Sequence, residues 1–376
     1  MNKKKILCFC LALGAFSAMM AQETLSLSQC LQMAVDNNLS LQKSRNEIAK
    51  GKYSISENQA KLLPQINAVA QLNDNFTPPV SVTDGSAYGK PYNVTKTLQY
   101  NASAGLQLQM PLYNQMVNTA IDIAKIADHL NQLSYEKARE DLIVQTAKMY
   151  YMAQNTAEQI RLVNDNIKRL EELYGITQAF YDNQMSLEVD VKRVKLNIEN
   201  LTVQRDNAIA MLDQQYTMLK YVIDYPADKQ IKVSEVNPGE IETVNANGLN
   251  THLYELQLLE KRKELAQKQT KLAKDGYLPS VSLTGSLMYS AFTDKIEHWI
   301  HSGESNHWYG SNGIGIQLRV PVFDGFEKRS NIRRAKMEEE NARIGYEDAL
   351  KGMQANYMNA VSEVNNSQRN YKKQFD

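Results

Sequence analysis

Four stretches of this chain alternate strictly between apolar and polar residues. In one of them Leu106, Leu108 and Met110 face one way while Gln107 and Gln109 face the other. This period of two is typical of a β-strand, and no helix has it. Each stretch runs about 9 to 12 residues, close to the ~9 to 11 that a tilted transmembrane strand needs. The length favours four membrane-spanning strands over a soluble sandwich with one wet face, which alternation alone would allow.

The four stretches belong to a duplicated plan. Leu63-Pro64-Gln65-Ile66 recurs as Leu278-Pro279-Ser280-Val281, and Leu108-Gln109-Met110-Pro111-Leu112 recurs as Leu318-Arg319-Val320-Pro321-Val322. The offsets of 215 and 210 residues are nearly equal, which predicts an internal repeat with the order helix, strand, strand, helix. The four prolines are expected at strand ends, where a missing backbone donor costs no ladder bond.

The repeat gives the expected boundaries. The first repeat is placed at 22–225, with strands at about 64–73 and 101–111 and a long helical hairpin at 113–222. A connecting segment follows at 226–247, and the second repeat is placed at 248–376, with strands at about 279–289 and 311–321. The loops 74–97 and 290–309 are long and rich in small, polar and aromatic residues, like the outward loops of membrane barrels.

The hairpin is predicted to be a coiled coil. Neither Pro nor Gly occurs between Tyr113 and Tyr174, and apolar residues recur there at spacings of three and four. The segment 175–185 interrupts this pattern and is read as the hairpin tip, after which Leu187 resumes the spacing. The leading segment 28–62 and the returning helix together match the length of the long helix. Two columns of helix are therefore expected in each repeat.

The N-terminus indicates the compartment of the protein, and the charge balance limits the classes of partner. Residues 1–21 combine a basic start, an apolar run and a small residue at Ala21, which indicates a secretory signal peptide. The chain has 42 basic and 42 acidic residues, and removing the signal leaves a formal charge of about −3. No nucleic-acid partner is expected. The one cysteine that remains, Cys30, is predicted to be inert helix packing.

No enzyme chemistry emerges from the sequence. It contains no Gly-x-Ser-x-Gly, His-Glu-x-x-His or Cys-x-x-Cys pattern. His298, His301 and His307 could ligate a metal, but a polar outward loop is the favoured reading. We expect no catalytic residue, no cofactor and no metal.

Four strands cannot close into a barrel by themselves, because single-chain barrels start at about eight strands. Self-association is therefore expected. The polar strand residues are predicted to face the lumen: Gln107, Gln109, Gln317 and Arg319. Arg319 either biases the passage of anions or is structural. Trp299 and Trp308 are expected to form a membrane-interface aromatic belt.

These features together resemble the TolC-like outer-membrane efflux protein family. The strand starts at Leu63-Pro64 and Leu278-Pro279, the segments 110–113 and 320–325, and the segment 186–192 carry the resemblance, which covers essentially the whole mature chain. It implies an α+β membrane protein: a homotrimer whose four strands per chain form a shared 12-stranded barrel, continued by a helical coiled-coil tunnel. It also implies an outer-membrane location in a Gram-negative bacterium, with the tunnel extending into the periplasm.

The resemblance implies a function as well. The expected function is passive conduction of solutes from periplasm to exterior, within a tripartite efflux or type I secretion system that includes a periplasmic adaptor and an inner-membrane pump. The tip residues Asn183, Gln184 and Met185 would contact the adaptor, although Asn183 stands where the family commonly has Gly. The alternative is that the chain is itself a periplasmic adaptor; a coiled-coil surface or filament protein is a third reading.

Alignment of Pro111 with Pro321 places Asp376 opposite Asn166. We therefore expect the second repeat to lack roughly 59 residues of the pattern, the tip and returning helix of its hairpin. The family's gating residues lie there and cannot be assigned. The exported substrate, the energy source of the pump and the identity of the adaptor are also outside what the sequence tells.

Overall fold

The computed structural model describes residues 23–235, 253–295 and 308–375. The chain divides into two compact units. The hairpin unit comprises 1–47, 132–250 and 354–376, and the sheet unit comprises 48–131 and 251–353. The helices α3, α4 and α8 contribute residues to both units.

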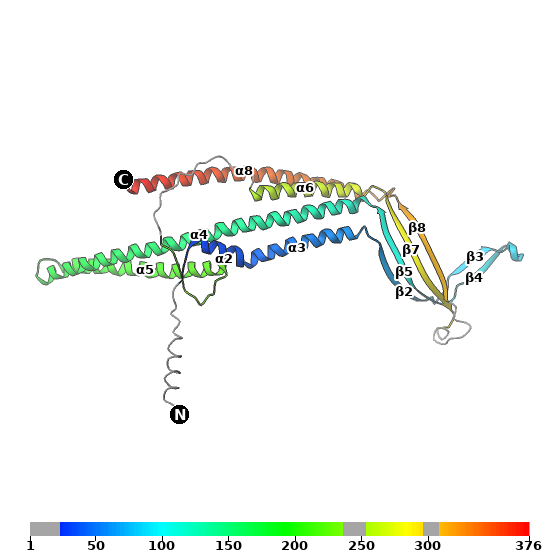
Figure 1. The fold of residues 1–376 in the computed structure, drawn as a ribbon, viewed down its shortest axis with the longest axis horizontal. Coiled ribbons are helices and arrows are strands. Elements are labelled where there is room, and N and C mark those ends of the chain that lie inside the picture. The colour runs from blue at the N-terminus through cyan, green and yellow to red at the C-terminus, as the bar shows by residue number, and fades with distance from the viewer. Residues whose placement is uncertain (1–22, 236–252, 296–307, 376) are drawn as a thin grey trace, which may run out of the picture. The chain divides into compact units, whose positions relative to one another are not determined.

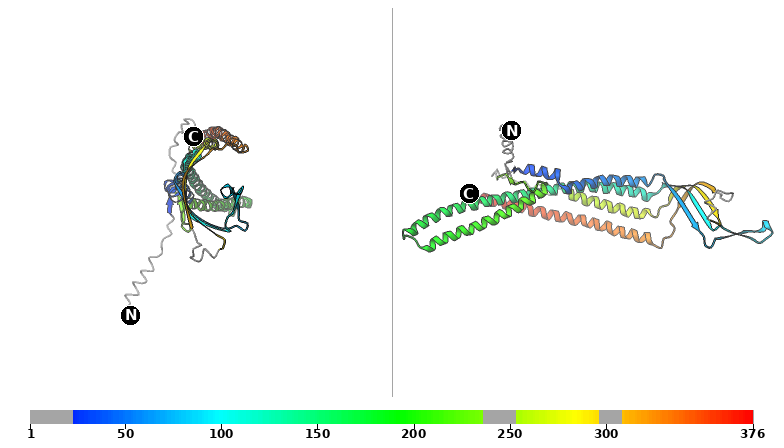
Figure 2. Two further views of the ribbon diagram at one scale, coloured as in Figure 1. Left: turned by 90° about the vertical axis from the view of Figure 1, so that its right-hand side faces the viewer. Right: turned by 90° about the horizontal axis from the view of Figure 1, so that it is seen from below.

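The hairpin unit is built on two long antiparallel helices, α4 (Gln115–Asp182) and α5 (Glu188–Ile223), which lie side by side in Figures 1 and 2. Their facing seam buries Ala153, Val163 and Ile167 from α4 and Val191 from α5, at the three- and four-residue spacings read from the sequence. The predicted coiled-coil hairpin is confirmed.

The predicted start of the tip, at residue 175, is wrong by two helical turns. The segment 175–185 was expected to interrupt the helix, but α4 continues through Gly175 and ends only at Asp182. A glycine inside a helix costs only about 1 kcal/mol relative to alanine, which the seam on either side of it offsets. The turn therefore consists of residues 183–187.

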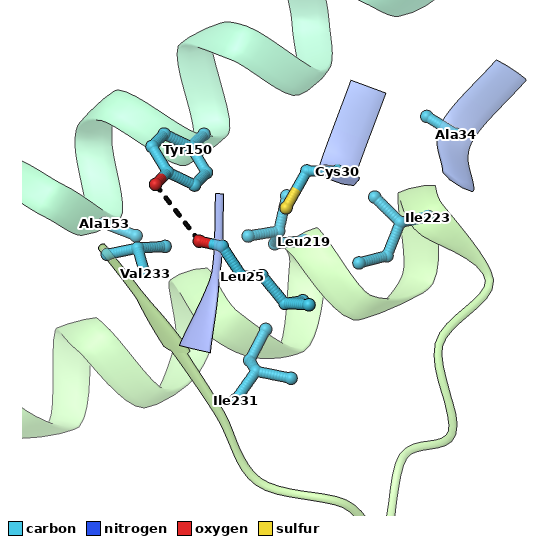
Figure 3. Close-up of a cluster of buried hydrophobic side chains, with 9 residues drawn as sticks. All are labelled: Leu25, Cys30, Ala34, Tyr150, Ala153, Leu219, Ile223, Ile231 and Val233. Atoms are coloured by element: carbon cyan, nitrogen blue, oxygen red, sulfur yellow. Dashed lines mark hydrogen bonds between the residues drawn. The ribbon is translucent and has the colours of Figure 1, made fainter. Parts of the chain in front are cut away.

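The core of the hairpin unit lies where short strands join the helices (Figure 3). Strand β1 (Glu23–Leu25) pairs in parallel with β6 (Ile231–Val233), and both pack with α2 (Leu27–Asn37) against α4 and α5. Cys30 is fully buried there. Burial without a polar partner raises the pKa of its thiol to about 11, in keeping with a packing role.

Tyr150 of α4 fastens the two short strands. Its hydroxyl donates to the carbonyl of Leu25 at 3.1 Å and accepts from the backbone N–H of Ser234, also at 3.1 Å. The side chain is 2% exposed. The same two backbone groups also bond each other, because the N–H of Ser234 donates to the carbonyl of Leu25 at 3.2 Å, and the tyrosine hydroxyl bonds the side-chain hydroxyl of Ser234 as well.

A single residue joins three helix ends in the hairpin unit. Asn38 lies between α2 and α3 (Leu39–Ala60), where one helical segment was predicted over 28–62. Its side-chain oxygen accepts from the N–H groups of Ser40 and Leu41, and its amide donates to the carbonyl of Val222, close to the end of α5. These bonds cap the start of α3 and hold it against the end of α5.

The sheet unit contains an antiparallel sheet of order β2-β5-β7-β8. The strands are β2 (Gln65–Asp74), β5 (Tyr100–Tyr113), β7 (Ser280–Thr293) and β8 (Trp308–Arg319), side by side in Figure 1. The four strands predicted from alternation are confirmed. Pro111, however, lies inside β5 instead of at its end, and the ladder to β7 shifts register between Pro111 and Tyr113. A bulge accommodates the missing donor.

The predicted loop 74–97 contains a second small sheet. Strands β3 (Val80–Asp84) and β4 (Tyr92–Lys96) form a hairpin around the 3₁₀ turn Ser86–Tyr88. A Cβ on Gly85 would approach the backbone of Tyr92 to 2.6 Å, so only glycine fits at this turn. Asp84 accepts from the backbone N–H of Ser86, which lowers the pKa of its carboxyl.

Helices α6 (Tyr254–Asp275) and α8 (Glu327–Phe375) complete the sheet unit. Lys268 of α6 forms an ion pair of 2.9 Å with Asp122 of α4, and the hydroxyl of Thr119 donates to the buried carboxylate of Asp275 at 2.5 Å. The start of α8 is capped by Asp324, which accepts from the backbone N–H of Lys328. Within the described residues, no helix has both the length and the apolar content needed to cross a membrane.

Candidate functional site

The four-stranded sheet has one apolar and one polar face. The ladder places Ile66, Leu108 and Ile314 in one row across the strands, and the next row on that face holds Leu283 and Ile316. These side chains face out of the unit: Ile66 is 67% exposed and Ile314 is 76% exposed. A wide apolar surface of this kind is costly in water and fits a lipid environment.

The opposite face carries the residues that the sequence predicted to face a lumen. The cross-strand register puts Gln107 beside Ser286 and Gly313, and Gln109 beside Thr284 and Gly315. Gln109 also lines a cavity of about 290 Å³ together with Gln317 and Arg319. The structure thus brings three of the four predicted residues into one cavity and places Gln107 on the same face one row away.

Lys61, which sequence reasoning missed, lines the same cavity as Arg319. It follows the end of α3 and precedes the Leu63-Pro64 strand start. Its sequence position could have predicted this location, because a residue at a helix-to-strand junction lies next to the first residues of the strand. Its ammonium donates to the side-chain oxygen of Asn58 at 2.9 Å.

Both outer strands of the sheet keep one edge without a ladder partner in the described chain. Strand β2 pairs with β5 alone and β8 pairs with β7 alone. Unpaired strand edges expose backbone donors and acceptors that lipid cannot satisfy. The sheet is therefore a segment that needs further strands on both sides before it can sit in a membrane.

The aromatic residues are only partly within the described chain. Trp308 opens β8 opposite Ala291 and is 48% exposed, with Tyr309 next to it opposite Ser290. Trp299 and the three histidines 298, 301 and 307 lie outside the described residues. Over 23–235, 253–295 and 308–375, no group of His, Cys, Asp and Glu is placed to hold a metal ion.

The tip of the hairpin unit closes with a defined helix-stop motif. The N–H of Met185 donates to the carbonyl of Phe180 at 2.8 Å, and the N–H of Gln184 donates to that of Tyr181 at 2.9 Å. This pair of bonds is the Schellman motif, in which one residue takes a left-handed conformation. That residue is Gln184, with φ of 58°, and not Asn183, the position at which a family glycine was expected.

The surface around the tip is apolar. Phe180 is 48% exposed, Met185 is 73% exposed and Leu187 is 71% exposed. The first turn of α5 adds an exposed ion pair of 2.7 Å between Glu188 and Lys192, and the carboxylate raises the pKa of the lysine. The three predicted tip residues, 183 to 185, therefore form the turn itself and border this apolar surface.

A sheet with one lipid-compatible face, whose strand β5 leads along the chain into a helical hairpin, defines a subunit of an outer-membrane channel. The family model for outer membrane efflux proteins matches residues 30–219 and 254–374, and the chain belongs to that family. The outer membrane protein TolC of Escherichia coli is 23% identical over 368 residues, covering 95% of this chain and 71% of TolC.

Solved structures share the fold. The outer membrane protein VceC of Vibrio cholerae superposes with a TM-score of 0.69 at 16% identity, covering 91% of this chain and 79% of VceC. The CmeC outer membrane channel of Campylobacter jejuni gives a TM-score of 0.66 at 19% identity, covering 92% of this chain and 74% of CmeC. The α+β channel fold predicted from the sequence is confirmed.

Proposed function

We propose that three copies of this chain form an outer-membrane efflux channel that conducts solutes passively from the periplasm to the exterior. The observation that carries the proposal is the sheet: it has one exposed apolar face and one polar face, and among the described residues β2 and β8 each have one edge without a partner strand. If β8 of one copy pairs with β2 of the next, the backbone groups of both edges gain hydrogen-bond partners. Closure of the sheet into a barrel then encloses the polar face as a lumen. Three copies supply twelve strands.

The polar face suits diffusion without tight binding. Its central rows hold small or neutral residues, among them Gln107, Ser286 and Gly313, which offer hydrogen bonds but no fixed charge. We assign no catalytic step and no cofactor to the chain, since conduction down a gradient requires neither. Energy is supplied by an inner-membrane pump that delivers solutes through a periplasmic adaptor.

The mass of the protein tests this assembly. The protein is extracted from the outer-membrane fraction in detergent, and its mass is measured by light scattering with the detergent contribution subtracted. A trimer is expected. A monomer recovered from the soluble periplasmic fraction would contradict the channel and favour the adaptor alternative, which neither the family match nor the lipid-compatible sheet supports.

The tip is proposed as the contact with the adaptor. The exposed apolar side chains of Phe180, Met185 and Leu187 supply a surface that a partner helix could bury. Met185→Cys should form a cross-link to the adaptor in intact cells. Met218→Cys is the control, because Met218 is also exposed, at 56%, but lies on α5 far along the chain from the turn. Equal cross-linking from both positions would argue against a tip contact.

A further inference from the structure

The cavity of about 290 Å³ on the polar face of the sheet unit is cationic. It lies where the ends of β2, β5, β7 and β8 meet the ends of α3 and α4. Two of its lining residues, Lys61 and Arg319, carry positive charge, and no lining residue is acidic. The rest of the wall offers neutral hydrogen-bond donors, namely Gln65, Gln109, Asn114, Ser280, Ser282 and Gln317.

The two charges are not neutralised within the described chain. Lys61 donates to the amide oxygen of Asn58, a neutral group that leaves its other donors available. Arg319 stands opposite Ser280 in the ladder, and no carboxylate of the described residues lies within ion-pair distance of it. Two other cations of the sheet unit do form ion pairs: Lys268 with Asp122 at 2.9 Å and Lys328 with Asp324 at 3.1 Å.

In the proposed trimeric channel each copy contributes the same two cations, and the inference below rests on that proposed assembly. Strand directions alternate across the sheet, so β8 of one copy would run antiparallel to β2 of the next. The Arg319 end of β8 would then meet the Gln65 end of β2, next to Lys61. Three copies would place six cations in one ring around the lumen, in a narrow space with low-dielectric walls that strengthen their field.

We propose that the ring of Lys61 and Arg319 is an anion-binding site of the lumen, through which solutes bearing phosphate or carboxylate groups pass in preference to cations. Guanidinium and ammonium groups are the side chains that bind such oxyanions, the first through a planar fork and the second as a point charge. The neutral donors around them complete the hydrogen bonds of a bound oxyanion. Transit stays fast because the ring is open to water on the lumen side.

The test is block of channel current by tripolyphosphate. The purified protein is inserted into a planar lipid bilayer in about 0.1 M KCl, where charges act over about 10 Å, and tripolyphosphate is added on the side of the barrel. Wild type should be blocked. The double variant Lys61→Gln/Arg319→Gln should bind the blocker at least tenfold more weakly, and Arg319→Lys, which keeps the charge, should retain most of the block.

A matched control removes the same charge elsewhere in the sheet unit. Lys52 and Arg329 are exposed and do not line the cavity, so Lys52→Gln/Arg329→Gln should leave the block unchanged. In about 1 M KCl, where the screening length falls to about 3 Å, block of wild type should largely disappear. Equal block of the two double variants, or no block of wild type, would overturn the anion site.

The outcomes separate the site from the channel itself. A wild-type protein that inserts but never conducts would refute the proposed function, and the site with it. A conducting wild type that resists block refutes the site alone. If the double variant fails to assemble as a trimer, the reversal potential of wild type in a KCl gradient decides: preference for chloride supports the ring, and preference for potassium overturns it.

Discussion

Replacing Tyr150 by Phe should loosen the core of the hairpin unit while its packing stays intact. The phenyl ring remains among Leu25, Ala153 and Leu219, so no cavity forms. What is lost is the hydroxyl with its three bonds: to the carbonyl of Leu25 and the N–H of Ser234, each at 3.1 Å, and to the side-chain hydroxyl of Ser234. The N–H of Ser234 keeps its bond of 3.2 Å to the carbonyl of Leu25. At about 1 kcal/mol for each of the lost bonds, the loss in stability is roughly 2–3 kcal/mol.

Native-state hydrogen exchange read by mass spectrometry measures this loss, because it reports local opening where global unfolding of a large assembly is not two-state. Amides of 23–30 and 228–234 should exchange roughly 30- to 150-fold faster, at about 1.4 kcal/mol per tenfold. Tyr151→Phe is the control: Tyr151 is 55% exposed and its ring packs edge-on against Tyr150. Exchange rates within about twofold of that control would refute the reasoning, since a bond worth 1 kcal/mol already exceeds that factor.

Three further predictions concern other parts of the chain. Burial raises the pKa of the Cys30 thiol from its ordinary value to about 11, so the stability that is complete below pH 9 should fall as the pH rises toward 11. Cys30→Ala should flatten that part of the pH-dependence of thermal unfolding. Gln184→Gly should slow amide hydrogen exchange at the tip several-fold, because glycine adopts the φ of 58° without the strain of about 1 kcal/mol that a side chain causes. Asn183→Gly should speed this exchange, because it removes the hydrogen bond from the Asn183 amide to a carbonyl of α4. Gly105→Ala should destabilise the sheet by about 3 kcal/mol or more, because the added Cβ would lie 2.1 Å from the backbone of β7, and heat-resistant oligomers should then be lost on gels. Gly313→Ala should leave the oligomers intact, because no atom lies within 4 Å of the position of its Cβ.

The sheet could be predicted because its signal is local. Alternation fixes which face each residue takes, and residues of matching parity on paired strands then share a face. For that reason Gln109, Gln317 and Arg319, taken from two distant stretches, meet in one cavity. Lys61 was missed because it precedes the strand, where period-two counting does not apply.

The parts that could not be predicted depend on contacts distant in sequence. Strands β1 and β6 have three residues each, too few to show any period, and they lie about 200 residues apart. Their pairing is defined by burial against Tyr150, which looks like any other helix residue in the sequence. The start of the tip was predicted too early because Gly175 resembles a helix end. The left-handed residue is Gln184, a residue type that no propensity favours at that position.

The parallel pairing of β1 with β6 also sets an order on folding. The first strand of the hairpin unit cannot find its partner until residues 231–233 have left the translocation machinery, and β5 must wait still longer for its neighbour β7 at 280–293. Such non-local strand pairs form slowly, because the chain between them loses conformational entropy on loop closure before any stabilising contact forms. Until β7 is available, the edge of β5 that pairs with it stays without a ladder partner. An unpaired strand edge beside an apolar face favours aggregation until the sheet is complete.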